Sequence, residues 1–190
     1  MPGPLSGSLQ RVFTLRGTKI TANQNQIALK GQRMSLEVAI PGWKVLHLEH
    51  VLFDLNGTLA CEGRIAPTTR ERLVALGRQV TLHVMSADTY GTLEREVAGL
   101  PLQLHRVEAG LGAAQKLAVL RQLGAAVTAA VGNGHNDVEM LREAALGIVV
   151  LGPEGAAVQA LLAAHVVFNA PDDALDALLK PRRLVATLRG

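Results

Sequence analysis

Short apolar segments alternate with segments of helical character along most of the chain, and this alternation restricts the fold more than any other feature of the sequence. Buried strands are expected at residues 51–55, 80–86, 102–107, 126–133, 146–152 and 165–168. Helices are expected between and after them at residues 67–79, 88–99, 111–124, 136–145, 154–164 and 171–179. Strands that alternate with helices in this way predict an α/β fold with a doubly wound, Rossmann-like, mostly parallel sheet and helices on both of its faces.

The composition agrees with a sheet that is buried on both faces. Apolar residues make up 48% of the 190 residues, whereas aromatic residues make up only 3%, so the core must consist mainly of aliphatic side chains. Such cores are typical of parallel sheets covered by helices. So few aromatic residues leave little surface for stacking on nucleic-acid bases, and no nucleic-acid partner is expected.

The positive charge of the chain is concentrated near its N-terminus. Residues 1–33 contain five basic and no acidic residues, so the rest carries a net charge of −2 although the whole chain carries +3. The segment is polar and glycine-rich, and it lacks the apolar stretch of a signal peptide. It is either a flexible basic extension or lies outside the native protein, which would then begin at Met34. We expect a dispensable, flexible extension over residues 1–33 and a single domain over residues 34–190.

The cysteine count and the hydropathy pattern both bear on the compartment. Cys61 is the single cysteine, so no internal disulfide can form and a reducing compartment is expected. The longest apolar region, residues 146–168, is interrupted by Gly152, Pro153 and Glu154, which makes it a poor membrane span. We therefore expect a cytoplasmic protein without a membrane partner.

A β-hairpin is expected ahead of the first buried strand. Residues 35–40 and 44–50 are extended segments on either side of the turn-forming sequence Pro-Gly-Trp. His47 and Glu49 alternate with leucines, so we expect them on the solvated face of a strand. His47 and His50 as a metal-binding pair is the alternative, but the pair has neither a helical spacing nor a third ligand.

The segment VLFDLNGTLA at residues 51–60 admits two interpretations. Asn56-Gly57 between apolar runs is the typical sequence of a two-residue hairpin turn, whereas Asp54 at the end of a buried strand is a candidate catalytic carboxylate. Further polar side chains follow the later strands: Ser86, Lys116, Asn133 and Asp137. Because ligands bind at the carboxyl ends of parallel strands, we expect these side chains to meet at one edge of the sheet, and we favour the catalytic interpretation.

These groups together suit one chemistry. A carboxylate can attack phosphorus, and a hydroxyl and an ammonium group can hold the phosphoryl oxygens. A second carboxylate can hold a magnesium ion that offsets the charge repulsion. The sequence therefore predicts phosphoryl transfer.

The order of these residues resembles the four motifs of the haloacid dehalogenase-like superfamily of aspartate-nucleophile phosphotransferases. The matching sequences are DLNGTL at 54–59, VMSAD at 84–88, Lys116 and VGNGHND at 131–137. The resemblance covers about residues 51–150. The sequences AALGIVV at 144–150 and KPRRLVATLR at 180–189 are similar to a soluble subgroup related to the phosphorylation domain of P-type ATPases.

The resemblance implies a magnesium-dependent phosphatase, a hydrolase of phosphoric esters or anhydrides, and assigns residues to three roles. The implied catalytic residues are Asp54 as the nucleophile, Asn56 and Lys116. The implied phosphate-binding residues are Gly57, Thr58, Ser86, Ala87 and Lys116. The implied ligands of Mg²⁺ are Asp54, the backbone carbonyl of Asn56, Asn133 and Asp137.

The sequence departs from the usual motifs at two positions. Phosphatases of the superfamily usually carry a second Asp two residues after the nucleophile, and this chain has Asn56 there. An amide cannot transfer protons at neutral pH, so general acid–base help worth roughly 10²–10⁴-fold should be missing. Asn133 stands where a metal-binding Asp is usual, and an uncharged ligand should bind Mg²⁺ more weakly. We expect a slow, ATPase-like enzyme; the alternative is a catalytically impaired domain that binds a phosphorylated ligand or a protein partner.

No cap domain is expected over the site. Only 31 residues separate Asp54 from Ser86 and 29 separate Ser86 from Lys116, and the predicted helices and strands use them up. By the resemblance, residues 58–65 would form a small hairpin flap. An open site suits a phosphorylated small molecule or a phosphoprotein as substrate, or a homo-oligomer in which a neighbour supplies the lid. Nothing in the sequence identifies the substrate itself.

Overall fold

The computed structural model describes residues 14–15, 18–19, 35–86, 93–108 and 110–190. The chain divides into two units, Met1–Arg33 and Met34–Gly190. In the first unit, β1 (Thr14–Leu15) and β2 (Thr18–Lys19) pair as antiparallel strands. Whether this unit is a dispensable extension stays a prediction.

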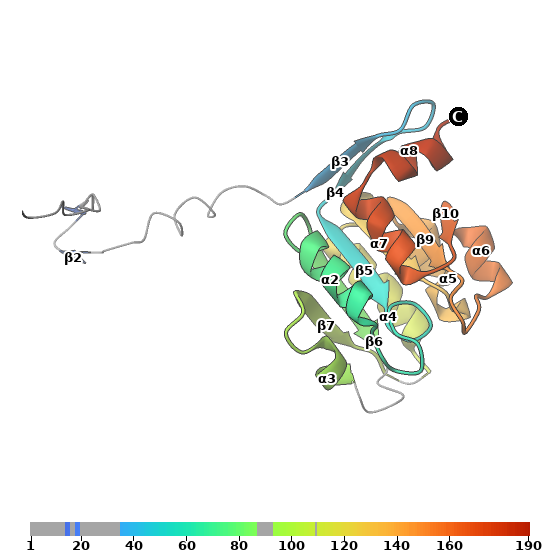
Figure 1. Ribbon diagram of the computed structural model, residues 1–190, viewed down its shortest axis with the longest axis horizontal. Helices are drawn as coiled ribbons and strands as arrows, with labels where there is room; N and C mark the ends of the chain where they lie inside the picture. The colour runs from blue at the N-terminus through green and yellow to red at the C-terminus, as the bar shows by residue number, and fades with distance from the viewer. Residues whose placement is uncertain (1–13, 16–17, 20–34, 87–92, 109) are drawn as a thin grey trace, which may run out of the picture. The chain divides into compact units, whose positions relative to one another are not determined.

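A six-stranded parallel sheet forms the centre of the second unit (Figure 1). Its strands are β5 (His50–Asp54), β6 (Thr81–Ser86), β7 (Leu102–Arg106), β8 (Thr128–Gly132), β9 (Leu146–Val150) and β10 (Val166–Phe168). They lie in the order β10-β9-β8-β5-β6-β7, and every neighbouring pair is parallel. The chain starts in the middle at β5, proceeds outward to β7, and then returns to β8 on the other side of β5. The switch point lies between β5 and β8, where open α/β sheets bind ligands.

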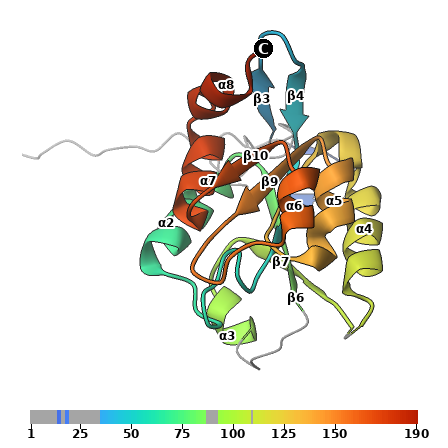
Figure 2. The ribbon, with the colours of Figure 1, turned by 90° about the vertical axis from the view of Figure 1, so that its right-hand side faces the viewer.

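Helices cover both faces of this sheet (Figure 2). On one face lie α2 (Pro67–Leu76), α7 (Pro171–Leu179) and α8 (Arg182–Leu188). On the other face lie α4 (Gly112–Leu123), α5 (Val138–Glu143) and α6 (Val158–Ala163). The remaining elements are α3 (Leu93–Val97) and two 3₁₀ helices, η1 (Ala125–Val127) and η2 (His135–Asp137). The arrangement confirms the predicted doubly wound sheet.

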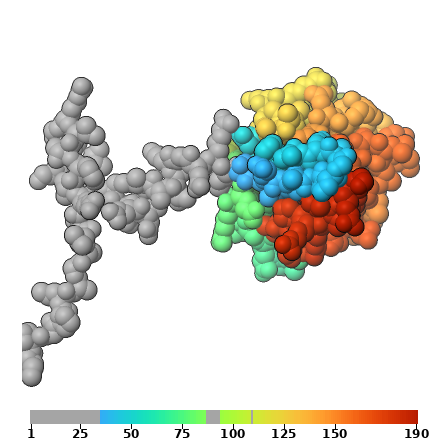
Figure 3. All heavy atoms as spheres, turned by 90° about the horizontal axis from the view of Figure 1, so that it is seen from above, coloured from blue at the N-terminus to red at the C-terminus, as the bar shows by residue number. Residues whose placement is uncertain are grey.

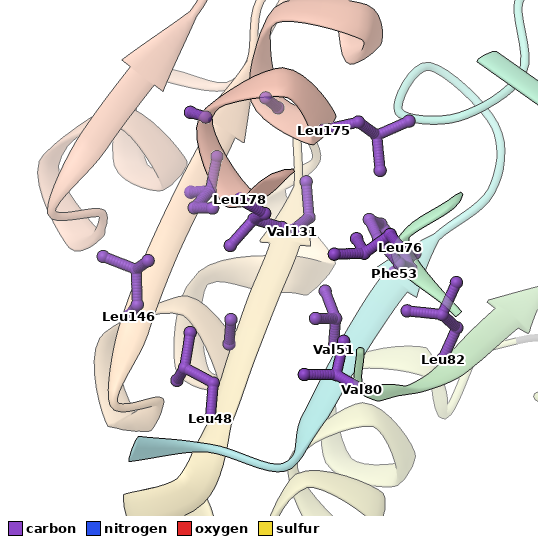
Figure 4. Packing of buried hydrophobic residues seen from close by; sticks show 14 of the residues in the cluster. Leu48, Val51, Phe53, Leu76, Val80, Leu82, Val131, Leu146, Leu175 and Leu178 are labelled. Carbon is purple, nitrogen blue, oxygen red and sulfur yellow. The ribbon is translucent and has the colours of Figure 1, made fainter. Parts of the chain in front are cut away.

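The central strands are apolar on both faces because both faces are covered. On β5, Val51 and Phe53 pack with the side chains of α2 and α7, whereas Leu52 packs with those of α4 and α5. Figure 4 shows Leu76 of α2 and Leu175 of α7 meeting Phe53 over the sheet. All of these side chains are buried, and each contributes about 1.5–3 kcal/mol by leaving water. A rigid core therefore fixes the strand that ends at Asp54.

The predicted hairpin is present at the opposite end of the sheet from Asp54. Its strands, β3 (Leu36–Ala39) and β4 (Val45–Leu48), are antiparallel, and β4 leads directly into β5. Lys44 Nζ donates to the carbonyl of Ala145 over 2.7 Å, and the backbone N–H of Gly190 donates to the carbonyl of Pro41 over 3.1 Å. Figure 3 shows the hairpin lying beside the C-terminal helix. The hairpin thus closes the far end of the sheet and does not reach the site.

Three histidines form a row across neighbouring strands of the sheet. Nδ1 of His50 on β5 lies 3.1 Å from Nε2 of His83 on β6, and Nδ1 of His83 lies 3.1 Å from Nε2 of His105 on β7. His83 is only 2% exposed. His47 points to solvent beside Glu37, as its predicted place on a solvated strand face requires. His47 and His50 therefore do not form a metal-binding pair.

The elements differ from the sequence predictions mainly at their ends. The helix predicted at 67–79 ends at Leu76, and the one predicted at 154–164 begins only at Val158. The helix α8 was not predicted at all. The start of the helix predicted at 88–99 lies outside the described residues. Among the helices that the structure describes, none is long and apolar enough to cross a membrane.

Candidate active site

Polar side chains from four strand–helix units line one cavity at the carboxyl edge of the sheet. The cavity measures about 510 Å³ and opens over the ends of β5, β6 and β8. Its lining includes the predicted site residues Asp54, Asn56, Ser86, Lys116 and Asn133. The structure therefore brings together side chains that lie up to 79 residues apart in the sequence. The predicted phosphate-binding residue Ala87 lies outside the described residues.

Lys116 is a buried cation held between two carboxylates. Its Nζ lies 2.7 Å from Oδ1 of Asp54 and 2.6 Å from Oδ1 of Asp137. Lys116 is 2% exposed and Asp137 is completely buried, so each charge would be costly without the others. Burial by itself would lower the pKa of Lys116, but the two carboxylates outweigh burial and raise it. Lys116 therefore stays protonated at neutral pH.

Asp54 is a strand-end carboxylate with a weakened acidity. Burial and the negative charge of Asp137 raise the pKa of Asp54 from 3.8 to about 6, although Lys116 favours its charged form. Its side chain is 13% exposed, so one side reaches the cavity. Oδ1 of Asp54 accepts from Lys116, and Oδ2 receives a long contact of 3.4 Å from the Thr58 hydroxyl. The backbone N–H of Leu55 also donates to this carboxylate.

Asp137 has both carboxylate oxygens occupied within the protein. Oδ1 accepts from Lys116, and Oδ2 accepts the backbone N–H groups of Asn133 and Gly134 over 2.9 Å and 2.8 Å. These contacts close the turn that follows β8 and fix the ammonium group of Lys116. Asp137 acts here as a positioning residue, and its predicted role as a metal ligand stays a prediction.

Asn133 is held from three sides. Its Oδ1 accepts the hydroxyl of Thr58 over 3.1 Å, its Nδ2 donates to the carbonyl of Gly155 over 2.9 Å, and its own carbonyl accepts the N–H of Ala157 over 2.8 Å. Gly57 has a φ of 76°, and a Cβ there would lie 2.3 Å from Nδ2 of Asn133. The chain can therefore pass this side chain only as glycine.

Gly155 is a site residue that the sequence analysis missed. It lies in the loop between β9 and α6, where we expected a helix to have begun. Gly152 and Gly155 both have a positive φ, and Pro153 stands between them. The sequence Gly-Pro-Glu-Gly was a signal for a loop at this point.

Asn56 does not form the hairpin turn that its sequence suggested. β5 pairs with β6 and β8, and the backbone N–H groups of Thr58 and Leu59 return to the carbonyl of Leu55 in a tight turn. The two-residue hairpin turn lies further along, at Glu62-Gly63, where both residues have a positive φ. The small flap predicted at 58–65 is therefore present. Asp54 belongs to a strand-end site, as we expected.

The Oδ1 atom of Asn56 is buried, and no described residue donates a hydrogen bond to it. Asn56 lines the same cavity as Asp54. The amide therefore occupies the place of the missing acid without forming a hydrogen bond within the described residues.

The remaining predicted phosphate binders differ in their access to the cavity. Ser86 ends β6 and lines the cavity, and its role as a phosphate ligand stays a prediction. Thr58 is almost completely buried, and its hydroxyl points at Asp54 and Asn133. Thr58 thus links Asp54 to Asn133. His135 on η2 also lines the cavity.

The donor atoms around Asp54 are the kind that suits a hard cation. A carboxylate oxygen of Asp54, the amide oxygen of Asn133 and a backbone carbonyl at Asn56 are all oxygen ligands, which Mg²⁺ prefers. Within the described part of the chain, no three His, Cys, Asp or Glu side chains gather as a metal cluster. These residues therefore fit Mg²⁺ with a ligand set of low charge.

Sequence comparisons find two small archaeal relatives. No protein-family model matches the chain. The uncharacterized protein MJ0073 of Methanocaldococcus jannaschii is 48% identical over 60 residues, which span 32% of this chain and 64% of that protein. The uncharacterized protein MJ0072 of the same organism is 44% identical over 39 residues, which span 20% of this chain and 89% of that protein. The chain thus covers somewhat less than two thirds of the first relative and most of the second.

Comparisons of structure find phosphatases of one fold. A 3-deoxy-D-manno-octulosonate 8-phosphate phosphatase from Moraxella catarrhalis, crystallised with magnesium and phosphate, matches with a TM-score of 0.59 at 17% identity, over 73% of this chain and 90% of that one. A YrbI-family phosphatase from Pseudomonas syringae matches with a TM-score of 0.57 at 21% identity, over 75% and 94%. A hydrolase of the haloacid dehalogenase superfamily from Legionella pneumophila matches with a TM-score of 0.59 at 13% identity, over 74% and 87%. The predicted haloacid dehalogenase-like fold is confirmed.

Proposed function

We propose that this chain, which belongs to the family of the Methanocaldococcus jannaschii protein MJ0072, is a magnesium-dependent phosphohydrolase. Its fold is that of the haloacid dehalogenase-like phosphatases, and we propose that it acts through an aspartyl phosphate on Asp54. The observation that carries the proposal is the buried Lys116 between Asp54 and Asp137 at the floor of an open cavity. A cation fixed beside a carboxylate serves a reaction that gathers negative charge at that point.

The reaction proceeds in two displacements at phosphorus. The carboxylate of Asp54 forms a bond to the phosphorus of the substrate while the bond to the leaving group breaks, and Lys116 and Ser86 hold the phosphoryl oxygens. Water then attacks the same phosphorus, and the bond to Asp54 breaks to release inorganic phosphate and restore the carboxylate. Asp54, Asn133 and the carbonyl of Asn56 would hold Mg²⁺, which would supply positive charge to offset the repulsion between carboxylate and phosphate.

Asn56 restricts the substrates that turn over well. Its side chain cannot give a proton to the departing oxygen, so the leaving group must be stable as an anion. Nucleoside di- and triphosphates and aryl phosphates meet this requirement, whereas alkyl esters do not. We therefore propose ATPase-like activity on a phosphorylated small molecule, with modest turnover. A phosphoprotein also suits the uncapped cavity, and the cytoplasm remains the proposed location.

The test is magnesium-dependent phosphate release from p-nitrophenyl phosphate, acetyl phosphate and ATP by the full chain and by Asp54→Asn. We expect release that requires Mg²⁺ and falls by at least about 10³-fold in Asp54→Asn, because the nucleophile is lost. Asp173→Asn, which alters an exposed acid on α7, is the matched control and should retain the wild-type rate. Equal rates in wild type and Asp54→Asn would exclude the mechanism.

A second candidate function is supported by the two amides that replace acids. Asn56 and Asn133 remove two negative charges from the usual site, and this change also suits a domain that binds a phosphorylated ligand or a protein partner without turning it over. Absence of phosphate release from the whole panel, together with calorimetric binding of inorganic phosphate, would favour that function.

A further inference from the structure

The metal subsite beside Asp54 has few free anionic oxygens. Asp54 and Asp137 together have four carboxylate oxygens. Lys116 engages one on each, and the backbone N–H groups after β8 engage the second oxygen of Asp137. Oδ2 of Asp54 has a long contact to the Thr58 hydroxyl, and the backbone N–H of Leu55 also donates to this carboxylate. Among the described residues, the cavity wall offers one further carboxylate, that of the exposed Glu108.

The hydrogen bonds around Asn133 require an uncharged amide side chain at this position. Its Nδ2 must donate, because the group that it faces at 2.9 Å is the carbonyl oxygen of Gly155. A carboxylate at position 133 would place a second acceptor against that carbonyl, with no proton between the two oxygens. The loop cannot easily withdraw, because the N–H of Ala157 is bonded to the carbonyl of Asn133 and Gly152 approaches the backbone of Gly57. The loop between β9 and α6 thus selects an uncharged metal ligand.

The charge of the site follows from these contacts. At the floor of the cavity, Asp54, Asp137 and Lys116 leave a net charge of −1, and the amides of Asn56 and Asn133 add none. Glu108 adds one negative charge on the exposed side of the cavity. A divalent cation reverses the charge at the floor and lies near the ammonium group of Lys116, which repels it. A phosphate dianion restores the balance and brings oxygen ligands of its own, which Mg²⁺ accepts readily.

We propose that this chain binds its divalent cation together with the phosphate of the substrate rather than before it. Asn133, held as an amide by Gly155, keeps the free site poor in negative charge, and the phosphate supplies the missing anionic ligand. The proposal rests on the proposed function, since it concerns the same site. Positive coupling of this kind is reciprocal, so each ligand must raise the affinity of the other by the same factor.

The first test is calorimetric titration of the full wild-type chain with Mg²⁺ alone, with inorganic phosphate alone, and with each in the presence of the other. We expect the affinity for Mg²⁺ to rise at least about tenfold when phosphate is present, and the affinity for phosphate to rise equally with Mg²⁺. Affinities that do not depend on the other ligand would overturn the proposal.

The second test is Asn133→Asp, titrated in the same way, with Asn136→Asp as the matched control. Asn136 is exposed on η2, so its replacement adds the same charge near the cavity without touching Gly155. We expect Asn133→Asp to melt at a lower temperature than wild type without metal, to bind Mg²⁺ more tightly in the absence of phosphate, and to lose most of the coupling. Asn136→Asp should keep the coupling. Wild-type coupling in Asn133→Asp would refute the role given to Asn133. If this variant does not fold, the titrations of the wild type still decide whether the cation and the phosphate bind together.

The binding tests and the phosphate-release test can give independent results. Asp54-dependent phosphate release with uncoupled binding would refute this inference alone. Coupled binding without any Asp54-dependent release would refute the hydrolytic function and leave the coupled site standing.

Discussion

Acidification should destabilise the protein through His83, the middle imidazole of the row on β5, β6 and β7. Both ring nitrogens of His83 lie 3.1 Å from a nitrogen of a neighbouring histidine, and the side chain is 2% exposed. Burial, followed by the charges that His50 and His105 would carry, lowers the pKa of His83 from 6.5 to about 4. The folded state therefore keeps this ring neutral at a pH where the unfolded chain protonates it.

The size and the sign of the effect follow from these two pKa values. Above pH 6.5, His83 is neutral in both states and its contribution to stability is complete. As the pH falls below 6.5, the unfolded state binds a proton that the folded state does not bind until about pH 4, so the free energy of unfolding falls in this window. The loss amounts to about 2 kcal/mol at pH 5 and approaches about 3 kcal/mol below pH 4.

The geometry of the row limits the number of protons that it can hold without losing a contact. Each of the two nitrogen–nitrogen contacts can hold one proton. Three neutral imidazoles have three N–H groups, of which two fill the contacts and one points outward. One extra proton can be placed at the other end of the row, whereas a second extra proton must put two N–H groups against each other. The doubly protonated row must therefore break one contact between its strands.

The assay is urea denaturation of wild type and His83→Gln followed by circular dichroism at pH 8 and pH 5. His83→Gln lowers stability at both pH values, but it should lose about 2 kcal/mol less than wild type between them, because its side chain does not titrate. Acidic residues titrate in both proteins and cancel in this difference. His47→Gln, which replaces a histidine that is 59% exposed, should show the pH dependence of the wild type. An equal loss in wild type and His83→Gln would refute the reasoning.

Two further predictions concern the candidate site. Lys116→Met should reduce phosphate release by at least about 100-fold and the free energy of unfolding by about 3 kcal/mol, because two buried carboxylates lose their shared cation. Urea denaturation and the phosphate assay measure the two effects. A variant as stable as wild type, with undiminished release, would contradict this prediction. Asn56→Asp should speed the hydrolysis of alkyl phosphate esters about 10-fold or more, relative to p-nitrophenyl phosphate, because the new carboxyl group can protonate a poor leaving group. An unchanged ratio of the two rates would show that proton transfer at this position does not limit the reaction.

The sequence predicts the central elements of the fold because their patterns are set locally. β5 reads as an unbroken apolar run, since both of its faces are buried. Gly124 has a φ of 96° and ends α4 where the sequence analysis placed its end. The helix α8 escaped prediction because Leu184 is its single buried side chain among the residues described for it. Val185 and Leu188 are only partly buried beside it, so the helix presents a narrow apolar stripe to the core.

The positions of the site residues are predictable for a similar reason, whereas their partners are not. Parallel strands end at a common edge, so Asp54, Ser86 and Asn133 had to lie close together once the strands were assigned. Whether Asp137 would face a metal or Lys116 depends on the angle of α4 against the sheet. That angle results from packing over the whole face of the sheet that α4, α5 and α6 cover. It cannot be predicted from the sequence around Asp137.

The two amides that replace acids are therefore different changes, although the sequence presents them alike. Oδ1 of Asn56 is buried without a donor among the described residues, so nothing in this part of the chain requires an amide there. Asn133 donates to Gly155, accepts from Thr58 and binds Ala157 through its carbonyl, so its amide is part of the packing of the loop between β9 and α6. An acid in place of Asn56 breaks no side-chain hydrogen bond to a described residue. An acid in place of Asn133 would lose the hydrogen bond to the carbonyl of Gly155 and destabilise the loop between β9 and α6. The structure of this loop therefore accounts for the low charge of the metal subsite.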